Sequence, residues 1–262
     1  MKLAFGIPAT RDPDRAARIG METERLGFST IWTNDIPQAS GLATAGHIAR
    51  ATSTIRIAVG VLPCDRNPPA QVAVAVRNLR LPLDRLVVGV GSGSSKNPLQ
   101  AVRAAIEHLR GDFGPALTIG LGAMGPRMCK LAGEVADVVL LNWMTPERVA
   151  WARRHIGAGS SRAGRRQPPE AVGYVRTAMG KGATERIRSE AEKYYAMPAY
   201  RRHFDAMGEE LQSVGLNADD EDLQSRLTGY GEVLDEVVIR AVPETDSLES
   251  TLAVAKAIAA AR

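Results

Sequence analysis

The sequence predicts an α/β fold: a closed (β/α)8 TIM barrel formed by residues 1–262 as a single domain. Short apolar runs alternate with helical segments at intervals of roughly thirty residues, which indicates repeated βα units. The runs are continuously apolar, as in parallel strands that are covered on both faces. Eight such units suit a chain of 262 residues. The alternative is an open, doubly wound sheet, which would gather its ligand contacts at one crevice.

The first half of the chain contains four expected strands, each followed by a helix. Residues 2–7 and 29–33 form the first two strands. Between them Asp12 is a good N-cap, Pro13 occupies the first helical position and Gly27 ends the helix. The remaining elements expected here are helix 43–52, strand 55–61, helix 68–81, strand 86–90 and helix 99–110.

The second half continues the alternation and adds a long helical stretch. The elements expected here are strand 117–121, helix 127–134, strand 137–141, helix 146–155, strand 171–178, strand 236–240 and helix 248–261. Residues 184–227 are helical in pattern, with breaks at Pro198 and Gly215. One barrel helix does not need this length, so we expect a helical insertion before the eighth strand.

Composition excludes several functional classes. The 33 basic and 29 acidic residues are interspersed, and few aromatic residues accompany the basic ones, so we expect no nucleic-acid binding. Cys64 and Cys129 have no metal-binding spacing, and we expect neither a metal site nor a disulfide. No apolar run reaches the length of about 20 residues that a membrane helix needs. The chain enters a strand without a signal peptide, so we expect a cytoplasmic protein.

Two glycine-rich turns follow neighbouring strands and are candidate anion sites. The first, residues 91–95, contains glycines and serines and leads to Pro98 at a helix start. The second, residues 120–126, repeats this plan. Backbone N–H groups at a helix N-terminus attract phosphate, and both turns should lie on the same face of a parallel sheet. The alternative is that each is only a tight turn between a strand and a helix.

Five blocks in this order carry a resemblance to a known family: ERLGFSTIWTND, ATSTIRIAVGVLPCDRNPPAQVA, LVVGVGSGS, GAMGPRMCKLAGEVADVVLLNW and DEVVIRAVP. Together they resemble the bacterial luciferase-like family, and most closely its members that use the deazaflavin coenzyme F420 rather than FMN. The resemblance covers nearly the whole chain. It implies a TIM barrel, an oxidoreductase activity on a small molecule and a homodimer. Small-residue helices at 43–51 and 70–76 also suit close packing between subunits.

The resemblance also assigns site residues. Asp35 matches an acid near the reactive part of the ring, although an aspartate at a strand end is also a common cap residue. Gly60 and Val61 match a bulge with a non-proline cis peptide that supports the ring from behind. The remaining cofactor contacts implied are Ser92 and Asn97 after the fourth strand, and Gly122, Ala123, Met124 and Gly125 at the phosphate.

Residues after the sixth strand and within the seventh are candidates for a substrate pocket. They are Asn142, Trp143, Tyr174 and Arg176, each of which can equally serve in packing or at the surface. The four histidines fall in helical segments, where we expect them on helix surfaces rather than as catalytic bases.

Two departures from the family pattern bear on activity. Many relatives have a proton-donating histidine where this chain has Ile36, which cannot transfer a proton. Longer segments of relatives are missing after Asn97 and after Gly111, so we expect a reduced lid. The first hypothesis is an F420-dependent oxidoreductase. The alternatives are an FMN-dependent luciferase-like monooxygenase and a non-catalytic protein that binds F420 or flavin.

Overall fold

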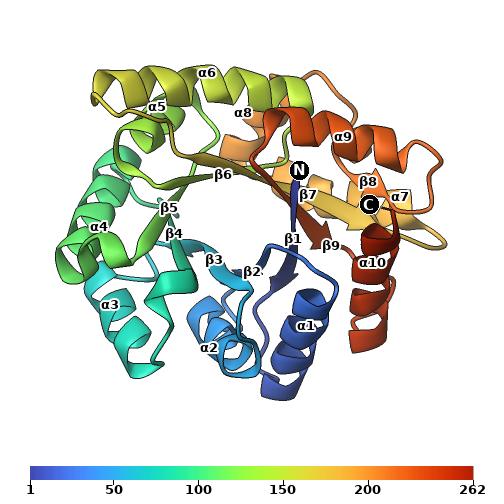
Figure 1. Cartoon of the computed structure of the whole chain (residues 1–262). Helices are drawn as coiled ribbons and strands as arrows, with labels where there is room; N and C mark the ends of the chain where they lie inside the picture. Colours follow the sequence, from blue (N-terminus) through green and yellow to red (C-terminus); the bar gives the residue numbers. More distant parts are fainter. Residues whose placement is uncertain (262) are drawn as a thin grey trace.

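The computed structural model describes residues 1–261, which form a closed ring of parallel strands surrounded by helices (Figure 1). The strands are β1 (Lys2–Pro8), β2 (Thr30–Asn34), β3 (Arg56–Pro63), β4 (Leu86–Gly91), β5 (Thr118–Gly122), β6 (Val138–Asn142), β7 (Glu170–Ala178), β8 (Leu216–Asn217) and β9 (Glu236–Ala241). The strands from β1 to β7 pair in chain order, and β9 closes the ring between β7 and β1. The predicted barrel is therefore confirmed, and the open-sheet alternative is wrong.

Helices cover the outside of this ring. They are α1 (Pro13–Arg25), α2 (Gly41–Ala51), α3 (Pro69–Asn78), α4 (Pro98–Phe113), α5 (Pro126–Val135), α6 (Pro146–Arg162), α7 (Ala183–Tyr195), α8 (Pro198–Asp205), α9 (Leu223–Val233) and α10 (Leu248–Ala260). Asp12 caps α1 as predicted, because its carboxylate accepts a hydrogen bond of 3.0 Å from the Arg15 N–H. Within residues 1–261, no helix combines the length and the apolar character that crossing a membrane requires.

The continuously apolar strands are buried on both faces, as their sequence predicts. Their outward side chains pack under the helices in the larger apolar core. Their inward side chains fill the barrel with a second cluster: Ala4, Trp32, Ala58, Val87, Val138, Leu140, Val172, Tyr174 and Val238. The barrel interior is thus packed, and space for a ligand exists only beyond the strand ends.

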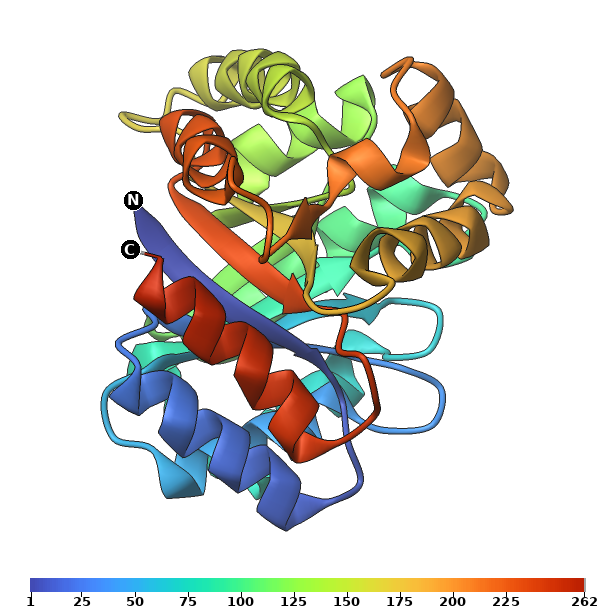
Figure 2. The ribbon, with the colours of Figure 1, turned by 90° about the vertical axis from the view of Figure 1, so that its right-hand side faces the viewer.

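The predicted insertion before the last barrel strand is confirmed. Helices α7 and α8 lie on the side toward which the strands point, so that they cover part of the barrel mouth (Figure 2). The insertion has an apolar cluster of its own, which includes Ile187 and Phe204. The sequence did not reveal β8, a two-residue strand that pairs with the end of β7 through Thr177 and Leu216.

Helix α6 continues to Arg162, beyond the expected end at residue 155. Its glycines allow close helix packing and do not end the helix. A Cβ on Gly159 would lie 1.9 Å from the Lys130 carbonyl oxygen of α5, and a Cβ on Gly133 would lie 2.0 Å from the Ile156 carbonyl oxygen. The two backbones approach each other so closely that only glycine fits at both positions.

Candidate functional site

The bulge predicted from the family resemblance is present at the mouth of the barrel. The peptide bond between Gly60 and Val61 is cis, and the pairing of β3 with β4 shifts register at this point. The Gly60 carbonyl oxygen accepts hydrogen bonds from the Asn34 side-chain amide and, at 3.3 Å, from the Tyr174 hydroxyl. Side chains from the neighbouring strand β2 and from β7 across the barrel therefore hold the bulge in place.

Only glycine fits at position 60. A Cβ there would lie 2.5 Å from the Tyr174 hydroxyl, 2.6 Å from a Leu140 methyl and 2.9 Å from the Trp32 ring. The Trp32 and Tyr174 rings meet edge to face at 5.8 Å between centroids. Burial raises the pKa of Tyr174 above its usual range, so the hydroxyl stays protonated and remains a donor to the bulge.

Asp35 lies at the end of β2, where both oxygens of its carboxylate are engaged. One accepts a hydrogen bond of 3.0 Å from the Gly41 N–H at the start of α2. The other accepts from Arg66 at 3.1 Å and from Asn67 at 3.3 Å. The Asp35 side chain is 7% exposed. This arrangement supports the interpretation of Asp35 as a cap residue. Its carboxylate positions the loops after β2 and β3. Contact of Asp35 with a cofactor stays a prediction.

Three of the predicted substrate-pocket residues, Asn142, Trp143 and Arg176, lie together beneath the insertion, whereas Tyr174 lies inside the barrel under the bulge. The Arg176 guanidinium forms an ion pair of 3.1 Å with Glu190 of α7 and donates to the Asn142 side-chain oxygen. It also lies 4.3 Å above the Trp143 ring. Trp143 is only 1% exposed, because the insertion covers it. These residues join the insertion to the barrel, and their contact with a substrate stays a prediction.

Arg240 is a mouth residue that the sequence reasoning missed. Its Nε donates a hydrogen bond of 3.0 Å to the Asn34 side-chain oxygen, and Nη1 donates to the Ala241 carbonyl oxygen. Among residues 1–261, no carboxylate lies within ion-pair distance of this guanidinium, and burial lowers its pKa. Arg240 lines a cavity of about 400 Å³ at the ends of β1 and β9. An arginine two residues after inward-facing Val238 was the available signal, because it places a charged side chain on the inward face near the strand end.

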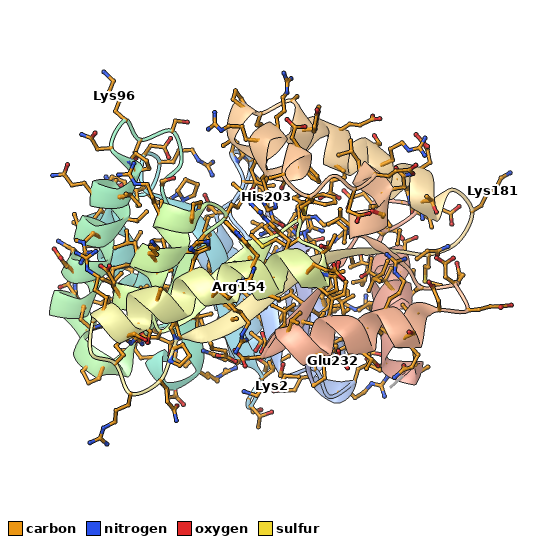
Figure 3. All side chains as sticks on the ribbon, turned by 90° about the horizontal axis from the view of Figure 1, so that it is seen from above. Lys2, Lys96, Arg154, Lys181, His203 and Glu232 are labelled. Atoms are coloured by element: carbon orange, nitrogen blue, oxygen red, sulfur yellow. The ribbon has the colours of Figure 1, made fainter. Side chains whose placement is uncertain are left out.

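The glycine turn after β4 holds a carboxylate of the chain itself. Asp65, from the loop after β3, accepts a hydrogen bond of 2.9 Å from the Ser94 N–H, and this bond lowers the pKa of Asp65. Gly93 has φ +54°, and a Cβ there would lie 1.9 Å from an Asp65 oxygen. Ser92 is half-buried and Asn97 is exposed. Figure 3 shows Lys96 of this turn projecting away from the molecule. Contact of Ser92 and Asn97 with the cofactor stays a prediction.

The glycine turn after β5 is open. Gly125 precedes α5 without a side-chain cap, and a Cβ built on it would meet no atom within 4 Å. Within residues 1–261, the N–H groups of Gly125, Arg127 and Met128 have no hydrogen-bond partner. The Ala123 N–H donates to the Leu140 carbonyl oxygen at 3.0 Å, which ties the turn to β6. Unpaired N–H groups at a helix N-terminus are suited to an anion.

The expectation that all four histidines lie on helix surfaces is wrong for His203. This side chain is 4% exposed, and its Nε2 lies 2.7 Å from the Trp143 carbonyl oxygen. Figure 3 places His203 inside the outline of the molecule, whereas Lys181 projects from it. Burial lowers the pKa of His203, so the ring is neutral and joins α8 to the end of β6.

The closed barrel and its polar mouth define a protein of the class that binds ligands at the carboxyl ends of barrel strands. The chain belongs to the luciferase-like monooxygenase family, whose pattern matches residues 3–113 and 114–239. It is 30% identical over 200 residues to a 5,10-methylenetetrahydromethanopterin reductase of Methanolobus tindarius, covering 62% of this chain and 61% of the relative. It is 28% identical over 193 residues to the enzyme of the same name from Archaeoglobus fulgidus, covering 60% and 58%. The matched region is less than two thirds of each relative.

Solved structures support the same architecture. An F420-dependent secondary alcohol dehydrogenase in complex with an F420-acetone adduct has a TM-score of 0.78 at 16% identity, covering 100% of this chain and 99% of the other. The F420-dependent tetrahydromethanopterin reductase from Methanopyrus kandleri has a TM-score of 0.78 at 17% identity, covering 98% and 97%. The oxygenating constituent of 3,6-diketocamphane monooxygenase from Pseudomonas putida, in complex with FMN, has a TM-score of 0.72 at 11% identity, covering 99% and 97%. At these identities the similarity establishes the fold.

Proposed function

We propose that this protein is an F420-dependent oxidoreductase that acts on a small organic substrate at the barrel mouth. The observation that carries the proposal is the contact between the bulge and the open turn. A Cβ on Gly122 would lie 3.1 Å from the Val61 side chain, so the β3 bulge and the β5 turn share one surface. The reductases and the alcohol dehydrogenase among the similar proteins support F420 as the cofactor.

The residues present fit such a cofactor. The N–H groups of Gly125, Arg127 and Met128 would hold its phosphate, since no other group of the described chain uses them. The bulge at Gly60 and Val61 would support the ring from behind. When bound, F420 would exchange a hydride with the substrate, whereas the protein supplies position and electrostatics.

The chain's own residues limit how a proton is delivered. The Ile36 side chain has no proton that it can transfer. The Asp35 carboxylate accepts hydrogen bonds from three donors. The Tyr174 hydroxyl is committed to the Gly60 carbonyl oxygen. We therefore expect the proton to come from water that enters the incompletely covered mouth. Arg240 would then orient a polar group of the substrate beside this surface.

The second candidate is an FMN-dependent monooxygenase. The family match and the FMN complex of a similar barrel favour it. Oxygen chemistry requires a closed and dry pocket, which the shortened segments after Asn97 and Gly111 disfavour. A third candidate is a protein that binds F420 or flavin without turnover, which the engaged Asp35 and the apolar Ile36 favour.

Titration with F420 and with FMN separates the cofactors, because binding changes the absorbance and fluorescence of each ring. The proposal predicts micromolar binding of F420 and weaker binding of FMN. Reoxidation of bound reduced F420 by a panel of carbonyl and enone compounds then separates an enzyme from a carrier. Binding without reoxidation by any acceptor supports the carrier, and preference for FMN supports the monooxygenase.

The homodimer and the cytoplasmic location expected from the sequence belong to this proposal. Light scattering at several protein concentrations tests the dimer directly. A mass of one 28.0 kDa chain at every concentration would contradict it.

A further inference from the structure

Two arginines lie side by side at the barrel mouth and share one carboxylate. Arg176 and Arg240 are paired residues of the adjacent strands β7 and β9. Glu190 of α7 forms an ion pair of 3.1 Å with Arg176, whereas among residues 1–261 no carboxylate pairs with Arg240. Burial lowers the pKa of Arg240, Glu190 raises it and the Arg176 charge lowers it. One positive charge at the mouth is therefore left without a partner, which is costly for a buried group.

The Arg240 guanidinium is held in position but keeps a free donor. Its Nε donates to the Asn34 side-chain oxygen at 3.0 Å, and the Asn34 amide nitrogen donates to the Gly60 carbonyl oxygen of the bulge. Nη1 donates to the Ala241 carbonyl oxygen, and within residues 1–261 Nη2 has no hydrogen-bond partner. Only one side chain thus separates this donor from the bulge that would support the cofactor ring.

The cavity that Arg240 lines combines this donor with apolar walls. Its volume of about 400 Å³ is typical of a site for a small molecule. Ile7 at the end of β1 and Ile36 after β2 belong to its lining. The cavity is therefore suited to a molecule with an apolar body and one polar end.

The other charged residues of this lining are paired or exposed. Arg15 forms an ion pair of 2.8 Å with Asp246. Glu190 is paired with Arg176, and Glu244 is exposed to solvent, which screens its charge. Among the lining residues, Arg240 therefore has the charge that a ligand can neutralise. A single positive charge matches a carboxylate better than a doubly charged phosphate.

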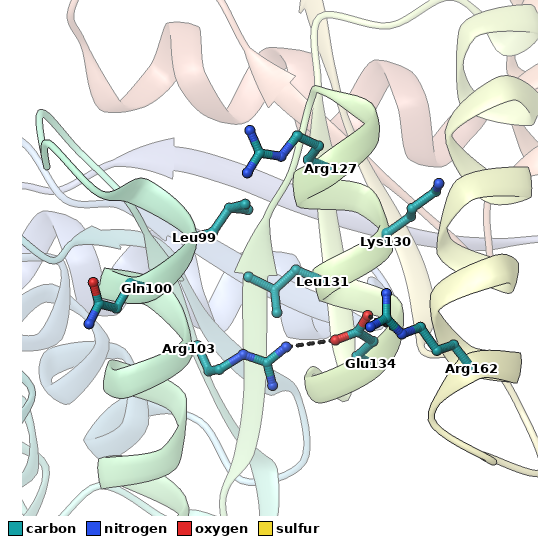
Figure 4. Close-up of a pocket in the computed structure, with 8 residues that line it drawn as sticks. All are labelled: Leu99, Gln100, Arg103, Arg127, Lys130, Leu131, Glu134 and Arg162. Carbon is teal, nitrogen blue, oxygen red and sulfur yellow. Dashed lines mark hydrogen bonds and ion pairs between the residues drawn. The ribbon is translucent and has the colours of Figure 1, made fainter.

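Positive charge also gathers on the outer surface, in the groove between α4 and α5 that Figure 4 shows. There Arg103 is paired with Glu134 at 2.6 Å, and Lys130 is exposed. Water and salt screen exposed charges, whereas a partly buried charge is screened much less. A single anion therefore gains more at Arg240 than in the outer groove.

We infer that Arg240 determines substrate specificity by binding a carboxylate, so that the substrates are small carboxylic acids with an apolar body. The inference rests on the proposed function, since it names the substrate class of the same mouth. Nη2 of Arg240 would donate to a carboxylate oxygen, and the apolar body would lie against Ile7 and Ile36. A charge-assisted hydrogen bond is stronger than a neutral one, so the site should distinguish an acid from its amide.

The test compares 5-oxohexanoate with 5-oxohexanamide, which has the same length and no charge. In calorimetric titrations the wild-type protein should bind the acid about tenfold more tightly than the amide. Arg240→Met should bring the two affinities to within about twofold of each other, and Arg240→Lys, which keeps the charge, should retain part of the preference. Turnover gives a second readout: in the reoxidation of reduced F420, the KM of the acid should lie about tenfold below that of the amide at similar kcat.

Two variants serve as matched controls. Arg15→Met removes an arginine of the same cavity that Asp246 already neutralises, and Lys130→Met removes a cation of the outer groove. Both should keep the preference for the acid. Circular dichroism and thermal unfolding of each variant would show that a loss of affinity is not a loss of folding.

The outcomes separate this inference from the proposed function. Equal affinity of the wild type for the acid and the amide, or binding of neither, would overturn the carboxylate site and leave the proposed function standing. A preference that survives in Arg240→Met, or that is lost equally in Lys130→Met, would overturn the role of Arg240. Failure of F420 to bind would overturn the proposed function, and the substrate class with it, even where Arg240 binds the acid.

Discussion

The two glycine turns have similar sequences and adjacent places in the barrel, yet among residues 1–261 only the turn after β4 holds a carboxylate of the chain. After β4, the Asp65 carboxylate accepts the Ser94 N–H at 2.9 Å. After β5, the Gly125 N–H and the first N–H groups of α5 have no partner among residues 1–261. The difference lies outside the turns, because Asp65 comes from the loop after β3. A glycine turn before a helix thus attracts an anion, and the rest of the fold decides whether that anion is a ligand.

The Asp65 contact also confirms the electrostatic argument made from the sequence. The Ser94 N–H lowers the pKa of Asp65, so the β4 turn does stabilise negative charge. The carboxylate that contacts Ser94 belongs to the chain, and ligand contact at the β4 turn stays a prediction. We propose the β5 turn, which holds no carboxylate of the described chain, as the place where a cofactor phosphate would bind.

The largest expected effect comes from giving the β5 turn a carboxylate of its own. Gly125→Asp is sterically allowed, since a Cβ there meets nothing within 4 Å and φ is −88°. The aspartate would cap α5 and raise stability by about 0.3 kcal/mol, because glycine is itself a favourable N-cap residue. It would also repel phosphate, and we expect F420 affinity to fall about 100-fold in a fluorescence titration.

Gly125→Ser is the matched control for this variant. Serine caps α5 without adding charge, so it should lower the affinity for F420 much less than aspartate does. Undiminished binding of F420 to the Gly125→Asp variant would contradict the proposal that the β5 turn binds the phosphate.

The next effect contrasts two glycines of the proposed cofactor site. Gly60 would lie behind the ring, and Gly125 would contact the phosphate. Gly60→Ala would force a Cβ to within 2.5 Å of the Tyr174 hydroxyl, whereas Gly125→Ala meets open space. We expect Gly60→Ala to lower the free energy of unfolding by about 1–3 kcal/mol. Gly125→Ala should lower it by only about 0.5 kcal/mol in denaturant titrations, because alanine fits there without a clash but is a poorer N-cap residue than glycine. Equal stability of the two variants would show that the bulge is not packed as described.

Glu24 is another carboxylate that backbone N–H groups hold, and it provides a reference for how strongly such donors stabilise a negative charge in this protein. Glu24 accepts hydrogen bonds from the N–H groups of Thr54 at 2.7 Å and Ile55 at 2.9 Å. Partial burial raises the pKa of Glu24, but these donors outweigh burial and lower it from 4.5 to about 2. The stabilisation is therefore complete above pH 4.5 and is lost as the pH falls toward 2.

We expect Glu24→Gln to lower the free energy of unfolding by about 1 kcal/mol at neutral pH. The difference from wild type should shrink as the pH falls through the same window, because wild-type Glu24 then becomes protonated. Urea titrations at a series of pH values measure both effects. A difference that does not change with pH would contradict the role of the charge.

The smallest effect is expected at the β4 turn. Asp65→Asn weakens the contact with Ser94, and because Asp65 is exposed and screened we expect a loss of only about 0.5 kcal/mol. The lowered pKa of Asp65 means that this stabilisation is present at neutral pH and disappears in acid. F420 affinity should stay within about twofold, since we propose that the phosphate binds at the other turn. A large loss of F420 affinity would move the phosphate to the β4 turn.

Local sequence signals were sufficient to predict the strands and helices of the barrel. Apolar runs located every barrel strand, and the Asp12 and Pro13 pair located the start of α1. The cis peptide at Gly60 and Val61 was predicted only through the family resemblance, since no spacing rule indicates it. The periodicity of apolar residues predicts helices and strands because it reflects which face of each element is buried.

Contacts between distant parts of the chain escaped sequence reasoning. Arg240 meets Asn34 across 206 positions, and this pairing follows only from closure of the ring. Asp65 reaches Ser94 because β3 and β4 are neighbours, which a turn pattern does not record. His203 is buried because α8 folds back onto the end of β6, although its helical position suggested a surface.

Amide spectra of the ¹⁵N-labelled protein with and without F420 test the central claim most directly. The account predicts that the N–H resonances of Gly125, Arg127 and Met128 shift on binding, because phosphate gives them their missing acceptor. The Ser94 resonance should remain nearly unchanged, because Asp65 already occupies that donor. A shift at Ser94 with no change at Gly125 would contradict the account.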